Sequence, residues 1–159
     1  MQLTIVAAGR LRAGPERALV DDYLARADKA GRGVGLFPVA ETEIEPKGGD
    51  LSARTDALLA AAPEGALIAV LDERGRALAS DAFAAKLADL RDGGARRMAF
   101  VIGEADGLHE SARSRADLVL AFGPQTWPHK LVRVMLAEQL YRAVAILAGS
   151  PYHRGDPGR

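Results

Sequence analysis

The last residues of the chain combine three side chains that could act together on a heterocyclic base. Tyr152, His153 and Arg154 follow one another near the C-terminus. An aromatic ring can stack on a base, an imidazole exchanges a proton near neutral pH, and a guanidinium can hold a phosphate. Chain termini often carry no function, however, and such a tail could equally have none.

Arg142 adds a second guanidinium, four residues after Glu138 in a segment with helical periodicity. This spacing allows an ion pair within one helix. Because the rest of the helix is apolar, Arg142 could instead reach across an interface into the site of a partner chain. The sequence leaves both roles open.

A strand-like segment ends at Gly103, and Gly107 follows four residues later, just before a predicted helix. In parallel α/β sheets, ligands bind at the carboxyl ends of the strands, and glycine lets a ligand approach the backbone closely. The segment therefore indicates either a ligand-binding loop or a tight turn between strand and helix.

Residues 122–133 form a second loop of this kind after the next predicted strand. Pro124 and Pro128 restrict its backbone, Trp127 offers an aromatic surface, and Thr126 and His129 stand where they could cap the next helix. Such a loop could hold a flat heterocycle through backbone hydrogen bonds. Tryptophan also serves apolar cores, so a structural role is the alternative.

Several common kinds of site do not fit. The chain has no cysteine, and its three histidines, at positions 109, 129 and 153, lack the spacing of metal ligands, so no metal is expected. Gly9 and Gly14 have the spacing of a phosphate-binding loop, but Pro15 and Glu16 follow where lysine and serine or threonine are needed. No Gly-x-Ser-x-Gly motif is present, which argues against a serine hydrolase.

Short apolar runs alternate with longer helical patterns, and this alternation predicts the elements that position these loops. We expect strands at residues 2–8, 35–39, 66–71, 98–103 and 118–122. Helices are expected at 15–29, 51–61, 80–90, 109–114 and 129–147, with Ser80 as an N-cap and a polar loop at 42–50. Strands alternating with crossover helices predict one domain, residues 1–159, with a three-layer α/β/α fold and a mostly parallel sheet.

The final helix is apolar on nearly every side, so either it is central to the fold or a second subunit covers part of it. We favour a homodimer. The net charge is zero, but residues 126–159 carry five basic and two acidic residues, a weak preference for a polyanion at this end. The absence of cysteine and of long apolar runs leads us to expect a cytoplasmic protein that binds no membrane.

Taken together, these segments resemble the ribosomal RNA large subunit methyltransferase H family, small members of the SPOUT superfamily. The resemblance runs nearly from end to end. It rests on Ala8-Gly9 after the first strand and on residues 71–75, 101–103, 126–129, 131–143 and 151–154.

The resemblance implies methyl transfer from S-adenosyl-L-methionine to N3 of a pseudouridine, position 1915 in helix 69 of 23S ribosomal RNA. Because a chain without net charge should bind free RNA weakly, we expect the assembled 70S ribosome to be the substrate. The resemblance also implies a homodimer and a C-terminal trefoil knot that forms the cofactor pocket. The residues that would line this pocket are Leu71, Gly103, Phe122, Gly123, Pro124, Gln125, Thr126 and Trp127. Those that would face the substrate are Arg142, Tyr152, His153 and Arg154.

Four positions depart from the usual family pattern: Glu104, Gly123, Pro124 and Gln125. The imide N3 loses its proton only well above neutral pH, so we assign His153 as the base, with Arg142 or Arg154 stabilising the developing charge. Proton loss to bulk water is the competing mechanism. The alternative functions are a SPOUT enzyme that modifies transfer RNA and a ribosome-associated protein without catalytic activity.

Overall fold

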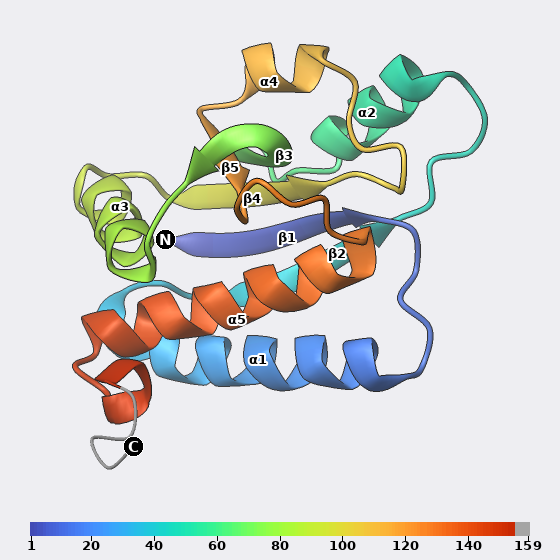
Figure 1. Ribbon diagram of the computed structural model, residues 1–159. Coiled ribbons are helices and arrows are strands. Elements are labelled where there is room, and N and C mark those ends of the chain that lie inside the picture. The colour runs from blue at the N-terminus through green and yellow to red at the C-terminus, as the bar shows by residue number, and fades with distance from the viewer. Residues whose placement is uncertain (155–159) are drawn as a thin grey trace.

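A five-stranded parallel sheet with strand order β2-β1-β4-β3-β5 forms the middle layer of the molecule (Figure 1). The computed structural model describes residues 1–154, with side chains as far as Tyr152. The strands are β1 (Gln2–Ala8), β2 (Val39–Ile44), β3 (Leu67–Ala77), β4 (Arg97–Ile102) and β5 (Leu118–Ala121). All five strands point the same way, so their carboxyl ends lie at one edge of the sheet.

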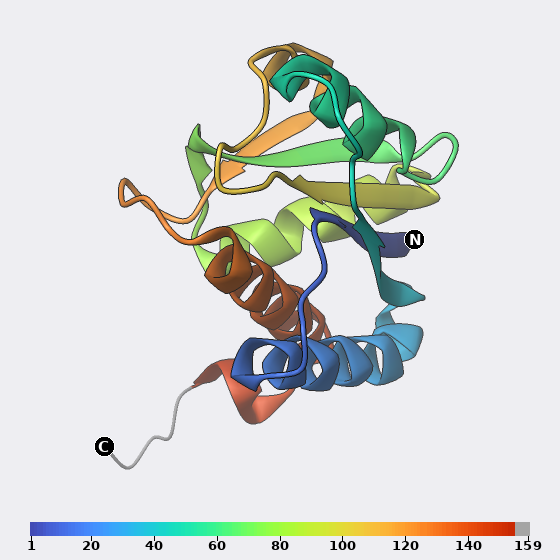
Figure 2. The ribbon, with the colours of Figure 1, turned by 90° about the vertical axis from the view of Figure 1, so that its right-hand side faces the viewer.

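Helices cover both faces of the sheet, as the three-layer prediction requires (Figure 2). One face carries α1 (Pro15–Gly31), α3 (Ser80–Asp92) and α5 (His129–Leu147), and the other carries α2 (Leu51–Ala60) and α4 (Ser111–Arg115). Two short 3-10 helices complete the chain, η1 (Arg32–Val34) and η2 (Pro151–Arg154).

Each face of the sheet has its own apolar core because side chains alternate along a strand. In β1, Leu3 and Ile5 belong to the core under α1, α3 and α5, whereas Val6 and Ala8 belong to the core under α2. All four are buried. Buried strands that pack on both faces are characteristic of parallel sheets.

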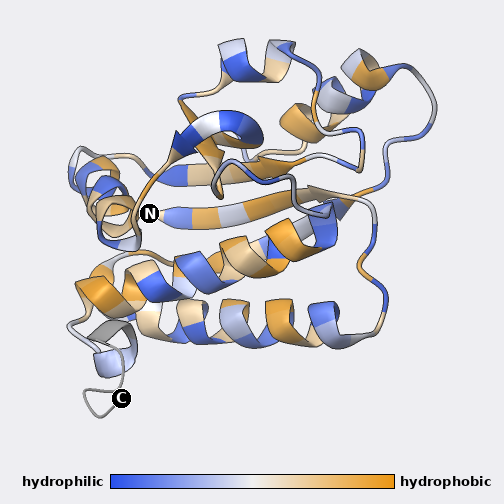
Figure 3. Cartoon of the chain, viewed as in Figure 1, coloured by the Kyte–Doolittle hydropathy of each residue, from blue (hydrophilic) through white to orange (hydrophobic). Residues whose placement is uncertain are grey.

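Helix α5 lies between α1, α3 and the sheet, and Leu136, Leu140 and Val144 are fully buried. Figure 3 shows apolar residues along the whole length of α5, with polar ones between them. The central position of α5 accounts for most of its apolar surface within one chain. Leu131, in the first turn of α5, is 40% exposed. The homodimer stays a prediction. No helix among residues 1–154 is long and apolar enough to cross a membrane.

Most helix bounds agree with the sequence prediction to within two residues, but the second strand was placed wrongly. The predicted strand at 35–39 ends where β2 begins, and residues 42–44, predicted as loop, belong to β2. β2 is an edge strand with Glu41 and Glu43 in its middle, so apolar periodicity cannot reveal it. β3 is also longer than predicted, because its pairing with β5 resumes at Arg76 after an interruption.

The predicted helix caps are also wrong. Ser80 is the first residue of α3 rather than its N-cap, and its hydroxyl donates to Oε1 of Gln139 on α5 at 2.8 Å. Pro128 occupies the N-cap position of α5, so neither Thr126 nor His129 caps that helix. The short helix predicted at 109–114 lies at Ser111–Arg115.

A buried ionic cluster ties α5 to β1, β2 and α1. Arg133, only 1% exposed, donates through Nε to Oε1 of Glu41 at 2.9 Å and through Nη1 to the carbonyl oxygen of Gly9 at 3.0 Å. Nη2 of Arg133 also pairs with Glu43. Arg17 reaches the other oxygen of Glu41 at 2.6 Å. The Glu41 and Glu43 side chains of β2 can therefore be largely covered, at 7% and 27% exposed, because two arginines compensate their charge.

Acid is expected to weaken the fold through Glu43. Burial raises the pKa of this carboxyl, but hydrogen bonds from the Leu11 N–H and Arg133 and the charges of Arg133 and Arg17 outweigh it, so the pKa lies below 4.5. Glu43 therefore stabilises the fold above about pH 4.5 and loses this contribution as pH falls through its lowered folded pKa. In urea denaturation, the free energy of unfolding of wild type should exceed that of Glu43→Gln most at neutral pH, and the difference should shrink in acid. A difference that is constant with pH would contradict this role.

Candidate functional site

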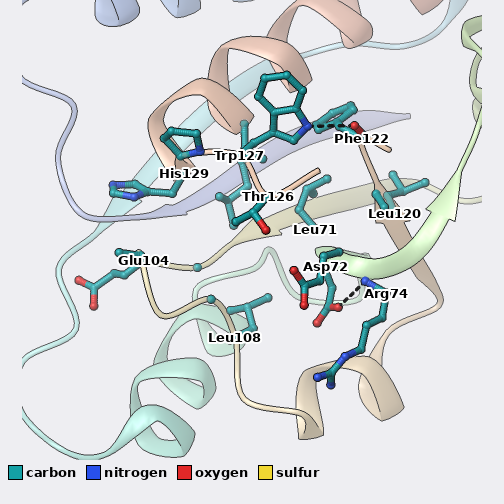
Figure 4. Close-up of a pocket in the computed structure, with 18 of the residues that line it drawn as sticks. Leu71, Asp72, Arg74, Glu104, Leu108, Leu120, Phe122, Thr126, Trp127 and His129 are labelled. Atoms are coloured by element: carbon teal, nitrogen blue, oxygen red, sulfur yellow. Dashed lines mark hydrogen bonds between the residues drawn. The ribbon is translucent and has the colours of Figure 1, made fainter. Parts of the chain in front are cut away.

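A cleft of about 660 Å³ opens at the carboxyl ends of β3, β4 and β5 (Figure 4). Ligand sites for small molecules commonly have 300–1,000 Å³, and in open α/β sheets they lie at this edge. Three segments form the walls: residues 71–74 in β3, residues 102–108 after β4, and residues 120–132 from β5 to the start of α5.

The loop after β4 is folded tightly against its own glycines. A Cβ on Gly103 would lie 2.3 Å from the carbonyl oxygen of Gly107, a contact that no side chain can tolerate. The Gly107 N–H in turn donates to the carbonyl of Glu104 at 2.9 Å, and Gly107 has a φ of +73°. The glycines identified in the sequence are therefore required by this turn, which brings the backbone to the surface of the cleft.

The second wall is a bulge within β3. Leu120 of β5 pairs with both Leu71 and Arg76, so the residues between them project from the ladder. A Cβ on Gly75 would lie 2.5 Å from the Leu120 backbone, which explains the glycine there. The bulge brings Asp72 to the cleft, a residue that sequence reasoning did not single out.

Asp72 holds the bulge together as an anion. Its Oδ1 accepts from the Arg74 N–H at 2.9 Å, and its Oδ2 accepts from Nη1 of Arg113 on α4 at 2.8 Å. Burial raises the pKa of Asp72, but these two hydrogen bonds and the Arg113 and Arg74 charges outweigh it and hold the pKa below 3.8. The carboxylate therefore remains charged near neutral pH.

The loop between β5 and α5 closes the third side. Nε1 of Trp127 donates to the carbonyl of Phe122 at 3.0 Å, so the indole folds the loop back on its own start (Figure 4). Gly123 has a φ of +94°, which a residue with a side chain rarely adopts. Trp127 is 40% exposed, so it belongs to the site rather than to the core.

His129, the first residue of α5, is the one imidazole on this cleft among the side chains of residues 1–152. Burial is the main cause that lowers its pKa below 6.5, and the charges of Lys130 and Arg133 lower it further, against the opposing effect of Glu104. Figure 4 shows His129 and Glu104 on the same side of the cleft. The imidazole is therefore neutral at pH 7 and can both donate and accept a hydrogen bond.

The structure brings together most of the residues that we expected to bind a cofactor. Those that line the cleft are Leu71, Gly103, Phe122, Gly123, Gln125, Thr126 and Trp127. Pro124 lies in the same loop without lining the cleft. Leu108, Leu120 and Val132 add apolar surface that sequence reasoning missed. The mixture of apolar side chains with backbone groups and a few charges suits a heterocycle that carries polar substituents.

Arg142 and Tyr152 lie together, but away from the cleft. Glu138 joins them: its Oε1 accepts from Nε of Arg142 at 2.9 Å and from the Tyr152 hydroxyl at 3.1 Å. The Arg142 guanidinium also lies over the Tyr152 ring, 4.9 Å from its centroid. The side chains of His153 and Arg154 lie outside the described residues. The ion pair of Arg142 with Glu138 is confirmed, with Nη2 of Arg142 2.6 Å from Oε1 of Glu138, and the reach toward a second site stays a prediction.

The Tyr152 phenol is not a proton acceptor. Burial, the Tyr23 hydroxyl and the Glu138 carboxylate all raise its pKa above the ordinary value. The Glu138 hydrogen bond likewise raises the pKa of Arg142 against the effect of burial. At neutral pH this group therefore presents a neutral phenol and a positive guanidinium.

These features define an α/β protein with an open cleft at the carboxyl edge of its parallel sheet. Among the described residues, no group of three or more histidine, aspartate or glutamate side chains could hold a metal ion. The family model described as "Predicted SPOUT methyltransferase" matches residues 1–153.

Three curated relatives give the more particular assignment. Proteins named "Ribosomal RNA large subunit methyltransferase H" from Dinoroseobacter shibae, Ruegeria sp. and Cereibacter sphaeroides are 56%, 54% and 58% identical to this chain. Each similarity covers 97% of this chain and 99% of the relative. The chain belongs to the SPOUT methyltransferases, in the family of these relatives.

Membership implies a methyl donor of the S-adenosylmethionine type and a C-terminal trefoil knot. A solved structure titled as a probable methylase family protein from Haemophilus influenzae Rd KW20 is 13% identical, with a TM-score of 0.49, and the similarity covers 95% of this chain and 69% of that chain.

Proposed function

We propose that this chain is a homodimeric enzyme that transfers a methyl group from S-adenosyl-L-methionine to N3 of a pseudouridine in helix 69 of 23S ribosomal RNA, acting on the assembled 70S ribosome in the cytoplasm. The observation that carries this proposal is the similarity over nearly the full length of relatives named for ribosomal RNA large subunit methylation. The cleft at the carboxyl edge supports it as the donor site.

The residues of the cleft fit this donor. Its volume suits a nucleoside with an amino acid substituent, and the exposed Gly107 in its wall presents backbone to a ligand without a side chain. Leu71, Leu120 and Phe122 offer apolar contact for an adenine ring. Thr126 and Gln125 supply polar groups beside them. When bound, S-adenosylmethionine supplies a methyl group that its sulfonium already activates.

The remaining chemistry is deprotonation and alignment of the acceptor nitrogen. We assign removal of the N3 proton to the His153 imidazole, and stabilisation of the resulting charge and of the RNA phosphate to Arg142 and Arg154. Tyr152 stacks on or orients the base, a role that its neutral phenol supports.

A second subunit is needed to bring these groups to a cleft. His129 begins α5 at the cleft, and Arg142 lies thirteen residues further, about 20 Å along the helix at about 1.5 Å per residue. Arg142 and Tyr152, which packs against it, are therefore distant from the cleft of their own chain. We assign Arg142, Tyr152, His153 and Arg154 to the cleft of the partner in the homodimer.

Calorimetry with S-adenosylmethionine tests the donor site first. Saturable binding is expected, together with weaker or no binding of free ribosomal RNA, because the chain has no net charge. A ribosome-associated protein without catalytic activity would show no saturable heat with the donor. Tight binding of transfer RNA would instead favour the enzyme that modifies transfer RNA.

Gly103→Ala is expected to weaken S-adenosylmethionine binding at least about tenfold, because a new Cβ must displace the Gly107 carbonyl and with it the wall of the cleft. Gly33→Ala is the matched control, since nothing lies within 4 Å of a Cβ at Gly33. Calorimetry on both variants measures the effect. Equal affinities in the two variants would contradict the assignment of the Gly103 loop to the donor site.

A further inference from the structure

Helix α2 holds the donor-site loop at two points. Nη1 of Arg54 donates to Oε2 of Glu104 at 2.7 Å, and Nη2 donates to Oδ2 of Asp106 at 3.5 Å. The next residue, Thr55, is 1% exposed, and its hydroxyl oxygen accepts from the His109 N–H at 2.9 Å. Glu104 and Asp106 both line the cleft, so these contacts set the position of one wall.

The helix itself is anchored independently of this loop. Asp50 caps it by accepting from the Ala53 N–H at 2.9 Å, and Leu58 and Leu59 are buried in the core between α2 and the sheet. Arg54 therefore extends from a fixed support. Its Nε is buried without a hydrogen-bond partner among the described residues, so its terminal nitrogens carry its contacts to the loop.

The charges make Arg54 important for the shape of the loop. Glu104 and Asp106 are two residues apart, and one guanidinium pairs with both. Without it, two carboxylates would stand close together at the mouth of the cleft. The side chains of Arg54, Glu104 and Asp106 are 27%, 38% and 70% exposed, and ion pairs exposed to this degree contribute little to folding. The expected effect of losing Arg54 is therefore on the cleft rather than on overall stability.

We propose that Arg54 is a positioning residue for the methyl donor: it acts through Glu104 and Asp106 to hold the loop after β4 in the shape that binds the donor. The inference rests on the proposed function for the identity of the ligand. Neither Arg54 nor α2 lines the cleft, so the residue acts from behind its wall.

A double-mutant cycle on donor affinity tests this role. Calorimetry with S-adenosylmethionine should show affinity about tenfold weaker in Arg54→Met and about fivefold weaker in Glu104→Gln. The double variant should be about tenfold weaker, as in Arg54→Met alone, because both changes break one interaction. Arg54→Lys, which keeps the charge but not the fork of donors, should recover most of the affinity. Thermal melting should be nearly the same in all four variants.

The control is a second ion pair made by the same helix. Arg115 of α4 pairs with Asp56 of α2, and neither residue lines the cleft. Arg115→Met should bind the donor within about twofold of wild type. The inference is overturned if Arg54→Met also stays within twofold, or if the two losses multiply to about fiftyfold in the double variant. Failure of the wild-type chain to bind the donor would overturn the proposed function and this inference together.

Discussion

Arg133→Met is expected to lower the free energy of unfolding by about 3–5 kcal/mol. The guanidinium is 1% exposed and pairs with Glu41 and Glu43, so its removal leaves one nearly buried and one partly buried carboxylate with only Arg17 as a cationic partner. The carbonyl oxygen of Gly9 also loses its donor. Urea denaturation followed by circular dichroism measures the change.

Arg26→Met is the matched control, because Arg26 and Asp22 form an exposed pair within α1. Its denaturation midpoint should equal that of wild type. The denaturation midpoint of Arg133→Lys should remain well below that of wild type. One ammonium group cannot replace the planar set of donors that joins Glu41, Glu43 and Gly9. If Arg133→Met and Arg26→Met had the same midpoint, the buried cluster would not be what fixes α5 against β2.

His153→Ala is expected to lower the rate of methyl transfer at least about a hundredfold, the contribution of a general base, with donor affinity unchanged. Rate and donor affinity should respond differently because, in the proposed geometry, the donor lies in one chain's cleft and the imidazole comes from the partner. Single-turnover assays with labelled donor and ribosomes measure the rate. A rate within about twofold of wild type, or a pH–rate profile identical in both proteins, would assign the proton to bulk water.

Mixed dimers test where His153 acts. At donor concentrations well below the Kd of Gly103→Ala, His153→Ala and Gly103→Ala should each retain about a tenth of wild-type activity or less alone. After the two proteins are mixed and exchange subunits, about one quarter of wild-type activity should return, because half of the dimers are mixed and each has one complete site. No recovery would mean that the tail serves the cleft of its own chain.

The elements that pack by apolar periodicity could be predicted from the sequence. β1, β4 and β5 are short buried runs, and α5 was bounded correctly at His129–Leu147. β2 could not be found in this way because Glu41 and Glu43 occupy its middle and are compensated by Arg133, some ninety residues away in sequence. Apolar periodicity predicts which apolar side chains are buried, but it cannot predict ion pairs between distant segments.

The cleft, too, could be predicted only in part. The glycines at strand ends and the Trp127 loop indicated two of its walls, and the family resemblance implied that they form one pocket. The bulge of β3, with Asp72 held by Arg113, depends on contacts between distant segments. The role proposed for Arg54 likewise depends on its contacts with Glu104 and Asp106, which only the folded chain brings together.

The most direct measurement is mass spectrometry of ribosomal RNA nucleosides from a strain that lacks this protein, with and without its gene restored. We expect helix 69 of 23S RNA to lose one methyl group from a pseudouridine, the restored gene to return it, and a gene encoding His153→Ala to fail to return it. An unchanged helix 69 in the deletion strain, or a methyl group missing from another RNA instead, would contradict the proposed function.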